Sequence, residues 1–220
     1  MPSDTHALFE HQLTDVAEIA SGRFVVRFAR QFEFAAGQVV AVALHRASVP
    51  RLYSICSGET DDEMQLLFDV RDGGDLTPRL AVSHKGDAIW VSEPYGSFLP
   101  FGDTPMWWIA TGTGIAPYHS MMRSGYRAAR LLHGARGVDH FYFENEFRAA
   151  YGARYIRCCS SSGEAGDFSG RVTAYLNSLE TLPMNAMYYL CGQSLMVVES
   201  RDLLIAKGVP FENIISEIYF

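Results

Sequence analysis

The sequence has few features that would place the protein in a membrane or an export pathway. Its 220 residues contain no apolar run near the roughly 20 residues that a helix needs to cross a bilayer. Residues 1–10 lack a basic segment followed by an apolar stretch, so no signal peptide is expected. We therefore expect a protein without a membrane span and with a cytoplasmic location.

Cysteine is scarce as well. The chain has Cys56, Cys158, Cys159 and Cys191, and none of them forms a C-x-x-C pair. Adjacent cysteines rarely pair with each other, so neither a disulfide framework nor a zinc site is expected. The spacing also differs from the C-x4-C-x2-C of plant-type iron–sulfur proteins. No metal is expected, and any one-electron redox partner would be a separate molecule.

Lysine is the scarcest charged residue. The net charge of −7 argues against nucleic acid as the main ligand. Of 18 basic residues only Lys85 and Lys207 are lysines, which leaves 16 arginines. Arginine suits bidentate phosphate recognition better than lysine does. A compositional bias of the genome is the alternative explanation.

The residues that are present divide the chain into two parts. Short β-rich runs at 24–28, 38–44, 51–57, 64–71 and 87–93 are separated by Gly, Asp and Ser, which favours an antiparallel barrel or sandwich. Strands at 106–110, 130–133, 154–159, 187–191 and 214–219 then alternate with helices at 140–150, 170–179 and 194–207. That alternation predicts a doubly wound α/β domain with a parallel sheet. The boundary is expected within 100–105.

The strongest local motif is Thr111-Gly112-Thr113-Gly114-Ile115-Ala116-Pro117, directly after an apolar strand. Pro117 suits the first turn of a helix, where its missing N–H would have no partner anyway. Glycines let the backbone approach a diphosphate at the helix N-terminus. A tight strand-to-helix turn without a ligand would also use glycine, so the motif indicates phosphate binding only in its context.

Two weaker motifs lie in the β-rich part. Arg51-Leu52-Tyr53-Ser54 offers a cation, a flat ring and a hydroxyl, although Tyr53 alone would be read as strand packing. Some twenty residues later comes Gly74-Asp75-Leu76-Thr77-Pro78-Arg79-Leu80. There Thr77 is expected to cap a short helix whose amides face a second diphosphate.

In this order the motifs resemble those of the ferredoxin–NADP(H) reductase family, over nearly the whole chain. The bacterial branch is most similar, through 73–80, 109–117, 133–136 and 183–185. The resemblance implies an antiparallel Greek-key β-barrel that binds FAD (1–101), followed by a doubly wound α/β parallel-sheet domain that binds NAD(P) (102–220).

The resemblance also implies roles for individual residues. Arg51 would bind the FAD diphosphate, Tyr53 would stack on the isoalloxazine, and Ser54 would hydrogen-bond near flavin N5. Further FAD ligands would be Leu52, Phe68, Asp69, Val70, Gly74, Leu76 and Thr77. The nicotinamide nucleotide would be held by Thr111, Gly112, Thr113, Gly114, Pro117, Arg136, Ser160, Ser161, Arg171, Cys191 and Gly192. The catalytic set would be Ser54, Cys191, Glu217 and Tyr219, although Cys191 taken by itself would be read as a small buried hydrophobe.

The chain ends in Glu217-Ile218-Tyr219-Phe220, which is similar to the Glu-x-Tyr ending of plant-type members. There the terminal aromatic covers the flavin, and here either Tyr219 or Phe220 would do so. The alternative is a final strand with alternating side chains.

Nucleotide choice rests on arginines. Bacterial members selective for NADPH carry Ser/Thr-Arg after the third strand, whereas this chain reads Cys159-Ser160-Ser161-Ser162. Arg171 matches a second phosphate-binding arginine of the family, and no carboxylate occupies 160–162. The sequence therefore favours NADPH over NADH only slightly.

The sequence thus predicts a hydride-transferring FAD enzyme that uses NADPH and delivers single electrons to a ferredoxin or flavodoxin. One alternative is an NADH-dependent reductase component that serves an oxygenase or another acceptor. A second is a non-catalytic flavoprotein that acts as a redox sensor or docking subunit.

Overall fold

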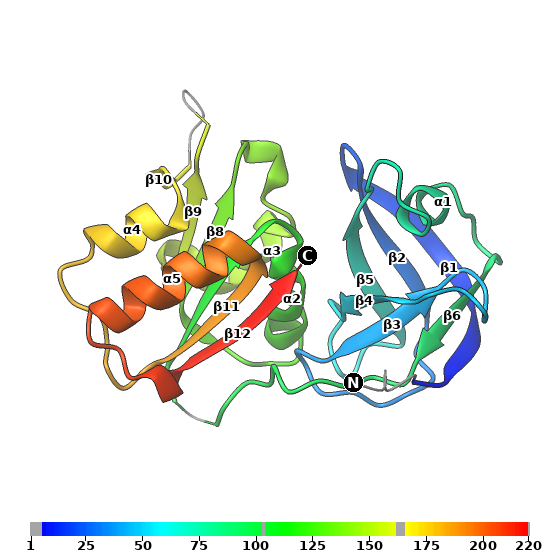
Figure 1. Ribbon diagram of the computed structural model, residues 1–220, viewed down its shortest axis with the longest axis horizontal. Helices are drawn as coiled ribbons and strands as arrows, with labels where there is room; N and C mark the ends of the chain where they lie inside the picture. The colour runs from blue at the N-terminus through cyan, green and yellow to red at the C-terminus, as the bar shows by residue number, and fades with distance from the viewer. Residues whose placement is uncertain (1–5, 103, 162–165, 220) are drawn as a thin grey trace. The chain divides into compact units, whose positions relative to one another are not determined.

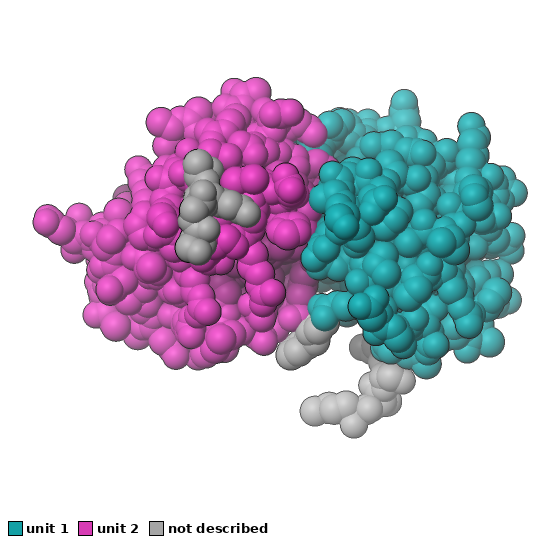
Figure 2. Space-filling model, turned by 90° about the horizontal axis from the view of Figure 1, so that it is seen from above, with its two compact units in different colours: residues 1–99, 116–125 teal, residues 100–115, 126–220 magenta. Residues whose placement is uncertain are grey.

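The computed structural model describes residues 6–102, 104–161 and 166–219. The chain forms two compact units (Figure 2): residues 1–99 with 116–125 make unit 1, and residues 100–115 with 126–220 make unit 2. The change between units thus falls beside the expected 100–105 boundary. The helix after the glycine-rich turn groups with unit 1, because its contacts are with the β-rich part of the chain.

Unit 1 is an antiparallel barrel of six strands (Figure 1). The sheet order is β4-β3-β6-β1-β2-β5, and the edge strands β4 and β5 are joined by an isolated bridge between Ile55 and Leu66. The strands are β1 (Leu8–Ala20), β2 (Arg23–Ala29), β3 (Val39–Ala43), β4 (Arg51–Ser54), β5 (Glu63–Asp69) and β6 (Ala88–Ser92), with helices α1 (Thr77–Ala81) and α2 (Ala116–Arg123). The barrel expected from the sequence is confirmed.

The barrel core is built from alternate residues of these strands. Val40, Val42, Leu66, Phe68 and Val91 all point inward and are nearly inaccessible to solvent. Five of the six strands lie within three residues of their predicted ends. Strand β1, the longest at 13 residues, was missed by the sequence patterns. It pairs with both β2 and β6, and two register shifts break its alternation, so no clean period of two is visible.

Helix α1 corrects one expectation. Thr77 does not cap this five-residue helix, because Leu76 is the N-cap residue and no side chain bonds to its amides. Instead the Thr77 Oγ1 accepts a hydrogen bond from the backbone N–H of Arg71 at 2.8 Å. The hydroxyl therefore closes the loop 71–77, which is a use that threonine side chains often serve in turns.

Unit 2 is a parallel α/β domain with sheet order β10-β9-β8-β7-β11-β12. The reversal of direction along the sheet between β7 and β11 is the switch point of a doubly wound fold, so the predicted class is confirmed. Its strands are β7 (Met106–Thr111), β8 (Ala128–Ala135), β9 (Tyr155–Cys159), β10 (Phe168–Ser169), β11 (Met187–Gln193) and β12 (Ile214–Tyr219). Its helices are α3 (Glu144–Tyr151), α4 (Val172–Ser178) and α5 (Ser194–Ala206), with short 3-10 turns at Gly112–Ile115, Val138–His140, Gly152–Arg154 and Phe211–Asn213.

Successive residues of β7 serve opposite faces of this sheet. Trp107 and Ile109 join the core beneath α4 and α5, which lie together on one face in Figure 1. Trp108 points the other way and meets Tyr151 of α3, with ring centroids 5.9 Å apart. Both tryptophans are buried, so the strand is apolar on both sides, as parallel strands between helices usually are.

The structure also bears on ligands and membranes. All four cysteines are buried, and each is present as a thiol. Within 6–102, 104–161 and 166–219, no group of three His, Cys, Asp or Glu side chains is arranged to hold a metal ion. In the same residues, no helix combines the length and the apolar character that a membrane crossing demands.

Candidate functional site

The barrel opens where β4 and β5 separate. The two strands share a bridge only at Ile55 and Leu66, supported by a 2.8 Å hydrogen bond from Cys56 N to the Gln65 carbonyl. Because the strands are antiparallel, Arg51–Ser54 and the end of β5 lie on the same side of that bridge. Tyr53 reaches across to Phe68, with ring centroids 6.4 Å apart. The two predicted flavin-binding strand segments therefore face each other.

Tyr53 is half-buried and lies in the field of two arginines. Burial raises the pKa of its hydroxyl to about 12, against the opposing positive charges of Arg51 and Arg71. Arg51 and Arg71 are both exposed. The ring is thus flanked by cations from two different segments, and Arg71 was not among the residues that the sequence singled out.

The loop 71–77 is closed by its own backbone. Gly74 N donates to the Arg71 carbonyl at 2.9 Å, and Arg71 N donates to Thr77 Oγ1. Gly74 is exposed, while Leu76 is 9% exposed and anchors the loop on the barrel. The loop therefore holds the side chain of Arg71 at the rim that also carries Tyr53.

The remaining flavin-binding candidates of the barrel, Phe68, Asp69 and Val70, make contacts within the barrel itself. Phe68 is buried and stacks on Phe24 at 5.6 Å, and Asp69 forms an ion pair with Arg23 at 3.0 Å. The Val70 N–H donates to the Gly22 carbonyl at 2.9 Å. The side chains of Phe68 and Asp69 are therefore committed within the barrel, and the Val70 N–H already has a backbone partner.

Ser54 and Leu52 differ sharply in exposure. Ser54 is 3% exposed at the end of β4, whereas Leu52 is 61% exposed. Side chains alternate along a strand, so Leu52 points to the opposite face from Tyr53. Only the backbone of Leu52 shares the face of the candidate site.

In unit 2 the glycine-rich turn lies against the end of β11. A Cβ on Gly114 would stand 2.4 Å from the Cys191 carbonyl oxygen, and one on Gly192 would stand 2.6 Å from the Thr111 carbonyl oxygen. Gly192 also has a φ of +133°, a backbone conformation that disfavours other residues. Gln193 N donates to Thr111 Oγ1 at 3.3 Å. The sheet thus brings Thr111–Gly114 and Cys191–Gly192 together at the switch point, where such folds bind ligands.

Three predicted catalytic residues also meet in unit 2. Parallel pairing sets Cys191 opposite Glu217, and the Cys191 Sγ lies 3.9 Å from Glu217 Oε2. Burial and the Glu217 charge raise the pKa of the Cys191 thiol well above its ordinary value, against a hydrogen bond with Tyr219. The thiol is therefore protonated and polar rather than nucleophilic. Ser54 belongs to unit 1, and Phe220 lies outside the described residues.

The carboxyl edge of the same sheet carries the remaining nucleotide candidates. Arg136, Ser160 and Arg171 follow the neighbouring parallel strands β8, β9 and β10. Ser161 N donates to the Arg136 carbonyl at 2.9 Å, which ties the first two loops together. Arg171 is the residue at the N-cap position of α4. Pro117 belongs to a different helix and is buried in the first turn of α2, as predicted.

Most arginines of the described chain form ion pairs, hydrogen bonds or cation–π contacts within the protein, but a few do not. Arg23, Arg27, Arg123, Arg148, Arg157 and Arg201 form ion pairs. Within the described ranges, five arginines have guanidinium groups that form no ion pair, hydrogen bond or cation–π contact. They are Arg51, Arg71, Arg79, Arg136 and Arg171. Four of these five lie in the segments proposed to bind phosphate. Compositional bias alone would not distribute them in this way.

Comparisons with known proteins agree with this geometry. The protein-family model described as "Oxidoreductase NAD-binding domain" matches residues 108–202 of this chain. A flavodoxin/ferredoxin–NADP reductase from Escherichia coli (strain K12) is 30% identical over 192 residues, covering 76% of this chain and 77% of that protein. The toluate 1,2-dioxygenase electron transfer component from Pseudomonas putida is 28% identical over 195 residues, covering 83% of this chain and 58% of that longer protein.

The fold has a close structural counterpart. A ferredoxin NADP+ reductase from Neisseria gonorrhoeae, solved with bound FAD and NADP, superposes with a TM-score of 0.88 over 97% of this chain and 99% of its own, at 20% identity. Together with the sequence relatives, this fold and its motifs show that the chain belongs to the ferredoxin–NADP(H) reductase family of flavoprotein oxidoreductases.

Proposed function

We propose that the protein is an NADPH-dependent FAD enzyme that delivers single electrons to a ferredoxin or flavodoxin. Residues 1–101 would form the FAD domain and residues 102–220 the NADPH domain. The observation that carries the proposal is a set of arginines whose side chains form no ion pair or hydrogen bond with the residues that the structure describes; they lie near Tyr53 in unit 1 and along the carboxyl edge of the sheet in unit 2.

The barrel residues fit a flavin dinucleotide. Arg51 and Arg71 supply two guanidinium groups for a diphosphate, and the half-buried Tyr53 ring, whose hydroxyl their charges act on, offers a flat apolar surface for stacking. Ser54, the next residue of the strand, is buried, and its hydroxyl would hydrogen-bond near flavin N5. A flavin held by Arg51, Tyr53 and Arg71 would supply the chemistry that links two-electron exchange with a nicotinamide to one-electron exchange with an acceptor.

The sheet residues fit a dinucleotide. The turn at 112–114 presents backbone rather than side chains to a diphosphate. A Cβ on Gly134 would stand 2.8 Å from Val172 and 2.9 Å from Thr111, so the turn and the start of α4 lie close together. Arg171, directly before Val172, is therefore within reach of the adenosine end of the same nucleotide.

The catalytic residues then align groups and exclude water. The protonated Cys191 thiol and the Glu217 carboxylate would orient the nicotinamide amide and balance its charge. Tyr219, at the end of β12, or Phe220 would cover the flavin until the nicotinamide displaces it. No strong acid or base is required, because the transfer is direct once the two rings are aligned.

The acceptor is proposed from two facts. These 220 residues have no cysteine spacing for an iron–sulfur cluster, which supports a one-electron acceptor outside them. Relatives at 30% identity are named for ferredoxin and flavodoxin. The match to the toluate dioxygenase component favours a second candidate, an NADH-dependent reductase of an oxygenase system.

One experiment separates these candidates. The protein is purified, its flavin identified by chromatography, and NADPH or NADH added anaerobically while flavin absorbance is followed. Released FAD and faster reduction by NADPH support the proposal, whereas FMN or a preference for NADH contradicts it. Arg171→Ala should bring the NADPH/NADH ratio, roughly 10- to 150-fold at most in the parent protein, toward unity. Reduced protein is then offered ferredoxin, flavodoxin and an oxygenase-type acceptor.

A further inference from the structure

We propose that His119 is a positioning residue. Its imidazole fastens helix α2 to the chain segment that follows strand β4, and this fastening holds the start of the helix, where the glycine-rich turn proposed to carry the nucleotide diphosphate ends. The inference rests on the proposed function, because it assigns His119 to the alignment step of hydride transfer.

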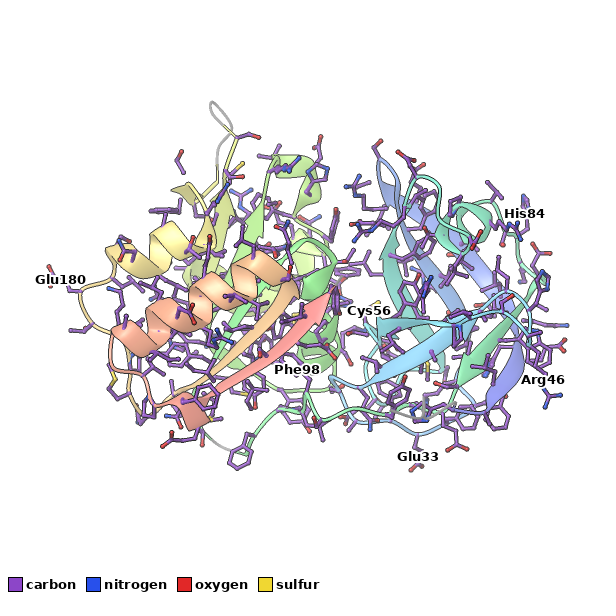
Figure 3. All side chains as sticks on the ribbon, in the orientation of Figure 1. Glu33, Arg46, Cys56, His84, Phe98 and Glu180 are labelled. Carbon is purple, nitrogen blue, oxygen red and sulfur yellow. The ribbon has the colours of Figure 1, made fainter. Side chains whose placement is uncertain are left out.

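The fastening is a single buried hydrogen bond. His119 Nδ1 lies 2.7 Å from the carbonyl oxygen of Cys56, the residue labelled in Figure 3. His119 is 2% exposed and Cys56 is completely buried. A carbonyl oxygen can only accept, so Nδ1 carries the proton and donates it. Cys56 comes two residues after Ser54, so the bond is made directly behind the proposed flavin-facing strand.

A second set of contacts holds the other end of α2. Arg123 donates two hydrogen bonds to the Asp61 carboxylate, at 2.8 and 3.0 Å. Ser124 Oγ accepts a bond from Glu59 N at 3.0 Å. His119 and Arg123 are four residues apart and therefore lie on one face of the helix. This face of α2 contacts one continuous segment of the barrel, residues 56–61.

The segment that receives these contacts is itself fixed. Ile55 N donates to the Gln38 carbonyl at 3.0 Å, and Gln65 N donates to Ser57 Oγ at 3.1 Å. A Cβ on Gly58 would stand 3.0 Å from the Arg123 Cβ, so helix and loop are in direct contact. The helix is thus held against an immobile part of the barrel.

The fastened helix begins where the glycine-rich turn ends. Residues 112–115 are followed without interruption by Ala116, the first residue of α2. A shift of the helix therefore moves the turn proposed to carry the nucleotide diphosphate. Hydride transfer is sensitive to such shifts, since a displacement of about 1 Å can lower a rate roughly a hundredfold.

The residue type supports this reading. His119 has buried neighbours Tyr118, Met121 and Met122 on the same helix, where an apolar side chain would be buried without loss. Burying an imidazole instead is unfavourable unless its polar atoms find partners. The bond from Nδ1 to the Cys56 carbonyl offsets that cost for one of the two ring nitrogens.

The test compares two substitutions of His119. Asparagine carries its amide at the same distance from the backbone as Nδ1 and can donate to Cys56, whereas leucine fills similar space without a donor. We expect His119→Leu to retain FAD and nucleotide affinity and to lower the limiting rate of anaerobic flavin reduction about tenfold. His119→Asn should recover most of that rate.

Hydrogen exchange of the flavin-free protein supplies an independent readout. Amides of 116–125 should lose protection in His119→Leu and keep it in His119→Asn. His11→Leu is the matched control, because it removes another buried imidazole of unit 1, one that packs on Phe28 and Phe32 instead of α2. It should change neither the reduction rate nor the exchange of this helix.

Several results would overturn the inference. These are a wild-type reduction rate in His119→Leu, equal loss in the Leu and Asn variants, or a rate loss explained by weaker nucleotide binding. If neither nucleotide reduces the flavin of the parent protein, the proposed function is wrong, and the role of His119 in hydride transfer is wrong as well. The exchange data alone then decide whether His119 fastens the helix.

Discussion

The two units present their candidate ligand groups by different means. In unit 1 they are side chains: the guanidinium groups of Arg51 and Arg71, and the Tyr53 ring, whose hydroxyl lies in their field. In unit 2 they are largely backbone, at a turn where Gly114 and Gly192 allow two chain segments to touch. Side chains at an exposed rim can be shortened with little disturbance. A glycine at a backbone contact cannot be enlarged unless the segments separate, because interiors are close-packed.

This difference has a consequence for evolution and engineering. Substitutions at the barrel rim should change cofactor affinity in steps, one contact at a time. Substitutions at the sheet turn should remove nucleotide affinity in a single step, because the turn either closes or fails to close. The following substitutions test this contrast, beginning with the largest expected effect.

Gly114→Ala should have the largest effect. Its new Cβ would stand 2.4 Å from a backbone oxygen, and neither strand can yield without breaking the parallel sheet. We expect a loss of about 3 kcal/mol or more in unfolding free energy, the upper range of overpacking effects, and a loss of nucleotide affinity of at least about a hundredfold. Thermal unfolding and nucleotide titration measure the two effects.

Gly112→Ala is the matched control for that glycine. Its φ is +56°, but nothing lies within 4 Å of an added Cβ. Only the conformational preference is violated, which costs about 1–2 kcal/mol. Equal damage from the two substitutions would show that the contact with Cys191 is not what makes Gly114 necessary.

Acid should destabilise unit 2 through His133. Complete burial lowers the pKa of this histidine from 6.5 to about 3, and its Nδ1 lies 3.1 Å from the Tyr155 hydroxyl. Between pH 6.5 and 3 the unfolded chain binds a proton that the native chain does not. Stability is therefore fully present above pH 6.5 and falls by about 1.4 kcal/mol for each pH unit below it.

His133→Phe should remove that part of the pH dependence. Its unfolding free energy at pH 7 should drop by about 1 kcal/mol through the lost bond to Tyr155, but it should fall less steeply toward pH 4. Urea unfolding at pH 7, 5.5 and 4 for both proteins gives the slopes. Parallel slopes would mean that other groups control the acid response. One such group is His11 of unit 1, because burial lowers its pKa as well.

At the barrel rim, Arg71→Ala should weaken FAD binding by a smaller step. A hydrogen bond to a charged group contributes about 1.5–3 kcal/mol, which corresponds to roughly 10- to 150-fold in affinity. The fold should be unaffected, because the side chain is exposed and the loop is closed by the backbone of residue 71. Arg46→Ala, an exposed arginine over Trp90, is the control. Equal affinity in the two variants would remove Arg71 from the site.

The sequence predicted much of unit 2 and less of the rim of unit 1. Buried parallel strands are continuous apolar runs, so strands such as 106–110 were visible without any partner. Strand β1 was missed because it serves two neighbours and is bulged, which hides its alternation. The proximity of Cys191 to Glu217 depends on strand register, which only the folded sheet fixes. The resemblance to known proteins named both residues as catalytic, but their contact was not predicted.

Arg71 and Thr77 show why site details resist prediction. Both lie in the loop that was singled out, but the loop closes through a bond between them that no local pattern indicates. Thr77 therefore serves residue 71 instead of the helix, and Arg71 is carried to the rim near Tyr53. The choice among backbone partners for one hydroxyl is decided by the path of the loop, which the barrel imposes.

The smallest effect is expected at Tyr53. If its ring stacks on the isoalloxazine, Tyr53→Ala should lose roughly 0.5–1.5 kcal/mol beyond the area that it buries, a decrease of about 2- to 12-fold in FAD affinity. Leu52→Ala, on the same strand but 61% exposed on its other face, should leave the affinity unchanged. Both variants keep the backbone of β4, so only the two side chains differ between them. Apoprotein titrated with FAD gives the affinities, and the flavin spectrum reports the stacking. Equal weakening in both variants would mean that β4 contributes through its backbone alone. The rim of unit 1 would then resemble the turn of unit 2, and the contrast between a side-chain site and a backbone site would fail.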